Sequence, residues 1–186
     1  AGKTVDYVVC DNGERLVLSP AYRVEWAEKA DTTYRALLYY NAATASSSPR
    51  TVVAVAASQV PVFRPLPASM LETVATDPLT VESVWLSENG RYINLALLLK
   101  TGKPDGTAEG QRLGLVLDGV STAADGTRCA MTRLYHSQGG VPEYYTSRYY
   151  VSVDTKDFSA DAISIEMNTY NGKVTKAIAF SDNSLR

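Results

Sequence analysis

Eleven short runs of alternating apolar and polar residues dominate the sequence. The clearest is RYINLALLLK at 91–100, whose apolar side consists of Ile93, Leu95, Leu97 and Leu99. A repeat of two residues matches the pleat of a β-strand, whereas an amphipathic helix needs a repeat of 3.6 residues. The other runs lie at 5–9, 15–18, 34–40, 51–56, 81–86, 112–117, 128–135, 148–153, 162–168 and 174–180. The sequence therefore predicts an all-β protein.

Turn-forming residues separate several of these runs. Asp11-Asn12-Gly13 lies between the first two runs, and Glu88-Asn89-Gly90 lies between the runs at 81–86 and 91–100. Tyr170-Asn171-Gly172-Lys173 lies between the last two runs. Asparagine and glycine tolerate the positive φ angles of tight hairpin turns better than other residues do. We therefore expect each of these pairs of runs to form an antiparallel hairpin.

The prolines indicate a boundary between two domains. Four of the eight lie close together, at Pro61, Pro65, Pro67 and Pro78. Proline fixes φ and removes a backbone donor, so a cluster of prolines is typical of a linker. Residues 1–66 carry seven basic and six acidic side chains, whereas the remainder has a net charge of −3. We predict a small barrel of about five strands at 1–66, a proline-rich linker at 67–79 and a β-sandwich at 80–186.

Composition and charge exclude several functional classes. The 186 residues are 45% hydrophobic and carry a net charge of −2, so they lack the basic surface that nucleic acids or anionic lipids require. No apolar run approaches the roughly 18 residues of a membrane-spanning helix. One histidine and two distant cysteines, Cys10 and Cys129, do not match any metal-binding spacing. We expect two separate buried thiols, with no metal, no cofactor and no nucleic acid partner.

No catalytic motif surrounds the single histidine, His136. It follows a predicted strand and precedes Ser137-Gln138-Gly139-Gly140, without a nucleophile elbow or a second histidine. A structural histidine at a strand end is therefore favoured over a general base. A hydrolase with a site of scattered carboxylates or serines stays open as an alternative, because carboxylate pairs are defined by their spacing in the fold. We predict that the protein is not an enzyme.

A cluster of tyrosines stands out as a candidate binding site. Five of the twelve tyrosines, at positions 135, 144, 145, 149 and 150, fall within sixteen residues. Tyrosine combines an apolar ring with a polar tip, which suits saccharide stacking and protein interfaces. Alternation along 148–153 predicts that Tyr149 packs in the core and that Tyr150 points outward with Arg148. The candidate binding residues are therefore Tyr144, Tyr145 and Tyr150, together with His136 at the start of the same loop.

Two residues near a predicted hairpin are expected to help set the core of the second domain. Trp85 and Asn94 lie on either side of the Glu88-Asn89-Gly90 turn, where their side chains either fill the sandwich or border its edge. If Trp85 is buried, its truncation to alanine should cost about 3 to 5 kcal/mol.

Several short segments form a pattern that spans nearly the whole chain. The most specific is Trp85 followed by Tyr92-Ile93-Asn94-Leu95. The others are the Asp11-Asn12-Gly13 turn, YRALLYY at 34–40, RLGLVL at 112–117, RLYHS at 133–137 and YVSVD at 150–154. Their order resembles that of the NigD-like family of Bacteroidetes envelope lipoproteins.

This resemblance implies a fold, a location and a general role. The fold would be an N-terminal OB-like barrel followed by a C-terminal immunoglobulin-like β-sandwich. A lipidated cysteine upstream of Ala1 would anchor the protein in the bacterial cell envelope and be its sole contact with a membrane. The family is connected with bacteriocins but has no established activity, so no mechanism is inherited. We expect a non-catalytic lipoprotein that binds an envelope protein or a glycan.

Overall fold

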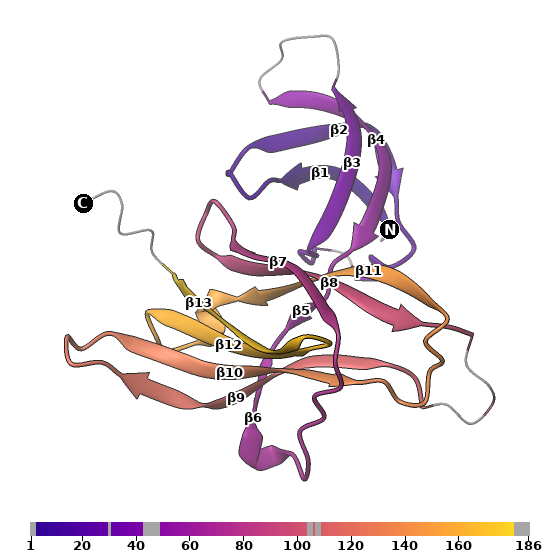
Figure 1. The fold of residues 1–186 in the computed structure, drawn as a ribbon. Coiled ribbons are helices and arrows are strands. Elements are labelled where there is room, and N and C mark those ends of the chain that lie inside the picture. The colour runs from indigo at the N-terminus through magenta and orange to yellow at the C-terminus, as the bar shows by residue number, and fades with distance from the viewer. Residues whose placement is uncertain (1–2, 30, 43–48, 104–105, 107–108, 181–186) are drawn as a thin grey trace. The chain divides into compact units, whose positions relative to one another are not determined.

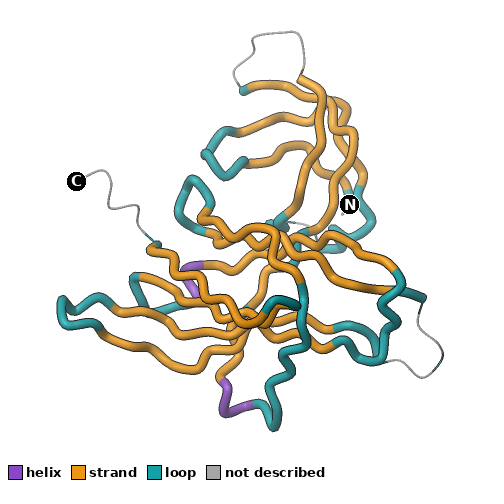
Figure 2. The backbone as a smooth tube through the Cα atoms, in the orientation of Figure 1, coloured by secondary structure: helices purple, strands orange, loops and turns teal. Residues whose placement is uncertain are grey.

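The chain folds into two compact units, Ala1–Pro61 and Val62–Arg186 (Figure 1). The computed structural model describes residues 3–29, 31–42, 49–103, 106 and 109–180. In this part of the chain the regular structure is β-strand apart from two short 3₁₀ helices (Figure 2). Each of the eleven alternating runs overlaps a strand, so the predicted all-β class is confirmed.

The first unit contains one four-stranded sheet of order β1-β2-β4-β3. Its strands are β1 (Thr4–Val9), β2 (Arg15–Arg23), β3 (Ala36–Ala42) and β4 (Arg50–Gln59). Leu16, Leu18 and Val52 form its buried centre. Within the described part of this unit, β1 and β3 are the two outer strands, so the closed OB-like barrel stays a prediction.

The second unit contains two sheets, of orders β13-β12-β10-β9-β6 and β5-β11-β8-β7. Its elements are β5 (Val62–Phe63), β6 (Pro65–Pro67), η1 (Ala68–Met70), β7 (Thr80–Leu86), β8 (Tyr92–Thr101), β9 (Arg112–Thr122), β10 (Arg128–Ser137), β11 (Tyr145–Asp154), η2 (Thr155–Asp157), β12 (Ala162–Thr169) and β13 (Gly172–Ala179). The three predicted hairpins, β1–β2, β7–β8 and β12–β13, are all antiparallel as expected. The pairs β10–β12, β9–β6 and β11–β5 are parallel.

The core of the second unit lies between its two sheets. From one sheet it takes alternate residues of β8 and β11, namely Ile93, Leu95, Leu97, Leu99, Val151 and Val153. From the other sheet it takes residues of β12, namely Ile163, Ile165 and Met167. Because one hydrophobic cluster receives side chains from both sheets, this unit is a two-layer β structure. Its immunoglobulin-like character stays a prediction.

The proline-rich segment is part of the second unit instead of a free linker. β5 pairs with the end of β11, and β6 pairs with the middle of β9. Two isolated bridges, Thr76 with His136 and Leu79 with Thr169, hold the rest of the segment. The division between the units therefore follows Pro61, five residues before the boundary expected from the sequence. Pro65 and Pro67 are tolerated in β6 because β6 is an edge strand.

Trp85 does not fill the core, contrary to the sequence-based expectation. Its side chain is 41% exposed on β7, whereas its neighbours Val84 and Leu86 pack against the core. Successive side chains of a strand point to opposite faces, and the core-facing positions of β7 are the even ones at this end. Asn94, opposite Trp85 on β8, is 6% exposed and accepts a hydrogen bond of 2.8 Å from the Ser152 hydroxyl.

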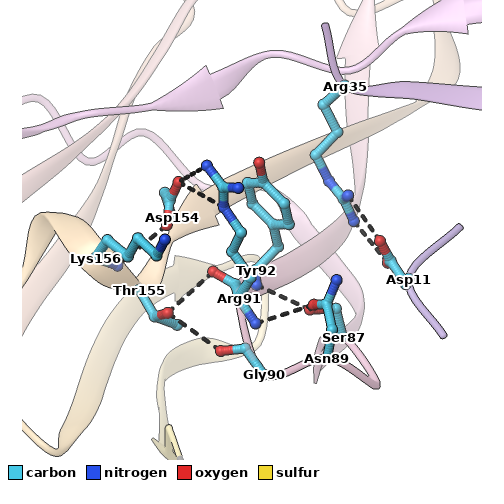
Figure 3. Close-up of polar contacts among 10 residues, drawn as sticks. All are labelled: Asp11, Arg35, Ser87, Asn89, Gly90, Arg91, Tyr92, Asp154, Thr155 and Lys156. Atoms are coloured by element: carbon cyan, nitrogen blue, oxygen red, sulfur yellow. Dashed lines mark hydrogen bonds and ion pairs between the residues drawn. The ribbon is translucent and has the colours of Figure 1, made fainter. Parts of the chain in front are cut away.

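Polar contacts tie the β7–β8 turn to the end of β11 (Figure 3). Inside the turn, the Ser87 hydroxyl donates to Asn89 Oδ1 and accepts from the Tyr92 backbone N–H, both at 2.8 Å. Across to the next strand, the Arg91 guanidinium bonds to Asp154 Oδ2 at 3.1 Å. The Thr155 hydroxyl donates to the Arg91 carbonyl at 3.0 Å. These bonds fix the turn that the Asn-Gly pair predicted.

Within the first unit, an ion pair fixes the β1–β2 turn. The Arg35 guanidinium donates to both carboxylate oxygens of Asp11, at 2.9 and 2.8 Å (Figure 3). Such a bidentate pair combines charge with a fixed geometry. It connects the turn to the residue that precedes β3.

The thiol of Cys10, at the end of β1, is expected to react slowly in the folded protein. Both cysteines are free and half-buried, so the expected separate thiols are present but not fully enclosed. Burial raises the pKa of the Cys10 thiol, and the carboxylates of Glu14 and Asp11 raise it further. Because the thiolate is the nucleophile, a raised pKa lowers reactivity at a given pH.

Alkylation with iodoacetamide at pH 8 tests this expectation in a Cys129→Ser variant, which leaves Cys10 as the sole thiol. The rate should be several-fold lower in the native protein than in the same variant unfolded in urea. Equal rates would contradict the raised pKa.

Candidate functional site

Three exposed tyrosines lie at the start of β11. Tyr144 is 79% exposed, Tyr145 58% and Tyr149 40%. Tyr145 and Tyr149 occupy the side of β11 that carries the core residues Val151 and Val153, since positions two residues apart share a face. Tyr149 is therefore on the expected face but not in the core, which corrects the prediction from the sequence. Tyr144, Tyr145 and Tyr149 are called the tyrosine surface below.

The exposure of Tyr149 follows from the pairing of β11. On one side β11 is paired with β8 along its whole length, from Tyr145 to Asp154. On the other side β5 pairs only with Ser152 and Val153. The first seven residues of β11 thus form an edge with no further strand among the residues that the structure describes. A ring on this part of the strand remains open to solvent on that side.

Tyr150 does not belong to the tyrosine surface. It is half-buried and lies on the opposite side of β11 from Tyr145 and Tyr149, as expected from the alternation. On its side of the strand, Arg148 forms an ion pair with Glu82 of β7. The hydrogen bond to Glu82 raises the pKa of the Arg148 guanidinium, with a smaller contribution from Tyr150. Tyr150 is thus placed beside a charged pair.

Hydrogen bonds of the half-buried Gln138 hold the loop that carries Tyr144. The Gln138 side-chain amide donates to the carbonyls of Val141, at 2.7 Å, and Lys100, at 3.1 Å. Its oxygen accepts a bond of 2.8 Å from Gln111. The Gln138 backbone N–H donates to Asp77 Oδ2 at 2.7 Å. Because one glutamine joins four segments, the loop between β10 and β11 is fixed at its base.

Gly102 positions the ring of Tyr144. The Tyr144 backbone N–H donates to the Thr101 carbonyl at 3.0 Å. A Cβ atom on Gly102 would lie 2.9 Å from Tyr144 Cδ2 and 2.8 Å from the Pro142 carbonyl oxygen. The Tyr144 ring therefore lies directly against the backbone of Gly102, in space that any side chain would occupy. One edge of the ring is covered by this backbone, while most of its surface remains exposed.

A charged and aromatic group borders this loop. The Lys100 ammonium lies 3.2 Å from Glu143 Oε2 and 4.2 Å from the centre of the Tyr170 ring. Burial raises the pKa of the Tyr170 hydroxyl, and the nearby Glu143 carboxylate raises it further. Lys100 is therefore neutralised by Glu143 and stacked on Tyr170, so the border of the loop carries no unpaired charge at these positions.

His136, expected among the binding residues, is buried instead. Its side chain is 1% exposed, and its Nδ1 lies 2.9 Å from the Asp77 carbonyl oxygen. A carbonyl only accepts, so Nδ1 carries the proton. The backbone of His136 also bonds to Ala75 and Asp77. The residue therefore holds the segment after η1 against β10, and a ligand at the surface does not reach its ring.

The arrangement contains no group of three potential metal ligands among the described histidine, cysteine and acidic residues. Hydrogen bonds from Lys3 and Arg23 lower the pKa of the Glu25 carboxyl group. A hydrogen bond from the Thr127 backbone N–H lowers the pKa of the Asp125 carboxyl group. A general acid needs the opposite shift, a raised pKa. At the tyrosine surface itself, three exposed rings with their hydroxyl groups are available for contact.

The fold matches several solved structures at low sequence identity. A protein of unknown function, DUF1344, from Bacteroides vulgatus has 19% identity and a TM-score of 0.69, over 98% of this chain and 90% of that one. A NigD-like immunity protein from Bacteroides caccae has 23% identity and a TM-score of 0.67, over 94% and 85% of the two chains. The chain shares the fold of a NigD-like protein. The resemblance seen in the sequence is confirmed at the level of the fold.

A third similar structure bears on the lipoprotein expectation. A candidate lipoprotein from Bacteroides fragilis has 11% identity and a TM-score of 0.65, over 98% of this chain and 97% of that one. No helix in the described ranges is long and apolar enough to cross a membrane. No family model and no curated protein matches the sequence. The names of these three similar structures state no catalytic activity.

Proposed function

We propose that this protein is a non-catalytic, lipid-anchored lipoprotein of the bacterial cell envelope that binds a protein or a glycan through the tyrosine surface. A NigD-like immunity protein and a candidate lipoprotein among the similar structures support the envelope location and a role in bacteriocin biology. At identities of 23% and 11%, these similarities reflect the fold alone. The proposed binding role therefore rests on the tyrosine surface of this chain.

One observation supports the binding role above the others: the most exposed tyrosine sits on a loop whose base is held by several hydrogen bonds. Tyr144 is 79% exposed, yet its ring lies against Gly102 and its loop is fixed by Gln138. An aromatic side chain held before binding loses little conformational entropy when a ligand arrives. Exposed aromatic rings on a rigid support are typical of interface anchors.

The alternative function, a hydrolase with a carboxylate or serine site, has less support. Catalysis of that kind needs a carboxyl group with a raised pKa or a serine beside a base. His136, the single histidine, is enclosed and bonded to a backbone carbonyl. The lowered pKa values of Glu25 and Asp125 do not favour it either.

Replacing Tyr144, Tyr145 and Tyr149 together by serine is the test of the proposed function. Binding of a detergent extract of the envelope and of a glycan array should fall by tenfold or more, since each anchor at a true hot spot is worth about 2 kcal/mol. The partners bound by the wild-type protein would be identified by mass spectrometry or by array position.

The matched control is Tyr39→Ser, which removes a ring 57% exposed on the first unit. It should leave binding unchanged. Circular dichroism should show that both variants remain folded, because these side chains are at the surface. Unchanged binding by the folded triple variant would refute the proposed function.

A further inference from the structure

The first part of β11 has an edge whose backbone groups pair with no strand among the residues that the structure describes. Thr155 donates its N–H to the Arg91 carbonyl, so its backbone groups face the β8 side of the strand. Because the register continues without a shift, the backbone groups of every second residue before it, Tyr145, Ser147, Tyr149 and Val151, also face β8. In an antiparallel pair, successive residues turn their N–H and C=O groups alternately toward and away from the partner strand. Those of Thr146, Arg148 and Tyr150 therefore point away from β8, and β5 begins only at Ser152.

This edge has little of the usual protection against strand pairing. Natural edges are shortened, bulged, covered, or supplied with proline and charged side chains. From Tyr145 to Val151 the β8–β11 register runs without a bulge, and the stretch contains no proline. Its single charged side chain, Arg148, is paired with Glu82. An open, regular edge of seven residues is a template for a further strand.

The chemistry of the edge selects one kind of occupant. Alternating N–H and C=O groups at strand spacing match the backbone of an extended peptide, which no glycan reproduces. A second copy of this chain could pair along the whole stretch 145–151 only with the two-fold centre at Arg148, and that register places two arginines directly opposite each other, which is unfavourable. The nearby cations Arg148 and Lys100 are already paired with Glu82 and Glu143. The complementary segment is therefore uncharged.

We propose that the edge of β11 binds an extended, uncharged peptide segment of a partner protein by β-strand addition. Main-chain bonds to Thr146, Arg148 and Tyr150 would hold the segment. Its alternate side chains would contact the rings of Tyr145 and Tyr149, which flank the edge on one side. This inference rests on the proposed binding function and specifies the ligand as a peptide instead of a glycan.

The test uses peptides selected on the full chain from a random library displayed on phage, then synthesised and measured by fluorescence anisotropy. Thr146→Pro removes one outward N–H without touching the ladder to β8, and Thr146→Ala is the matched control. Affinity should fall tenfold or more with proline and less than twofold with alanine. Methylation of single peptide amides should weaken binding at every second position only.

Hydrogen exchange on the wild-type protein gives a readout that needs no variant. The amides of Thr146, Arg148 and Tyr150 should exchange fast without peptide and slowly with it, whereas those of Ser147 and Tyr149 should be protected in both states. Failure to select any peptide, equal affinity for the two Thr146 variants, or unchanged exchange would overturn strand addition. If strand addition is overturned but replacing the three tyrosines by serine abolishes binding of a glycan or protein, the proposed function survives. If that triple variant binds as the wild type does, the proposed function and strand addition both fail.

Discussion

Replacing Leu95 by alanine is expected to lower the free energy of unfolding by about 3 to 5 kcal/mol. Leu95 is fully buried at the centre of β8, with Val84 of β7 on one side and Val151 of β11 on the other. Leu95 and Val151 belong to the core between the two sheets, and the partly buried Val84 packs against it. Because strands on both sides hold the backbone in place, the structure cannot collapse into the space that the leucine leaves.

Trp85→Ala provides the comparison, although tryptophan is the larger residue. Its side chain is 41% exposed, so we expect a cost of roughly 1 to 2 kcal/mol. Urea unfolding followed by circular dichroism suits both variants, because the signal does not depend on the indole. A Trp85→Ala cost equal to that of Leu95→Ala would show that the indole is part of the core, as the sequence suggested.

Strands were predictable wherever side chains alternate. The run at 91–100 identifies β8 and the face that carries Ile93, Leu95, Leu97 and Leu99 into the core, but it does not reveal that Asn94 and Ala96 on the opposite face are buried as well. β5 and β6 escape the same reasoning, since they are two and three residues long and β6 begins and ends with proline. Pairing with β11 and β9 defines them, and such pairing depends on residues far away in the sequence.

The candidate site was predictable in its loop but not in its strand. Glycines and proline after β10 indicate an irregular surface loop, and Tyr144 and Tyr145 are exposed there. For Tyr149, alternation gives the correct face but not the burial, because burial depends on where β5 begins to pair with β11. Gln138 and Gly102 have no recognisable motif, and their roles emerge only when distant segments come together.

Gly139→Ala is expected to displace the loop that carries the tyrosine surface and to cost about 2 to 4 kcal/mol. Gly139 has a φ of +58°, and a Cβ atom there would lie 2.1 Å from the Gly110 carbonyl oxygen. Both groups are backbone, so no side chain can turn away to make room. The Gly139 carbonyl also accepts the Glu109 N–H at 2.9 Å, and this bond would break if the loop moved.

Gly126→Ala separates the clash from the backbone strain. Gly126 has a φ of +87° with no atom within 4 Å of the added Cβ, so its cost should be about 1 kcal/mol, the penalty of the left-handed conformation alone. Thermal unfolding measures both variants. The Gly139 variant should also lose affinity for any ligand of the tyrosine surface, because Val141, Pro142 and Tyr144 follow in the same loop, whereas the Gly126 variant should bind normally. Equal stability losses would mean that the approach of Gly139 to Gly110 does not hold the loop, and the support inferred for Tyr144 would then rest on Gln138 and Gly102.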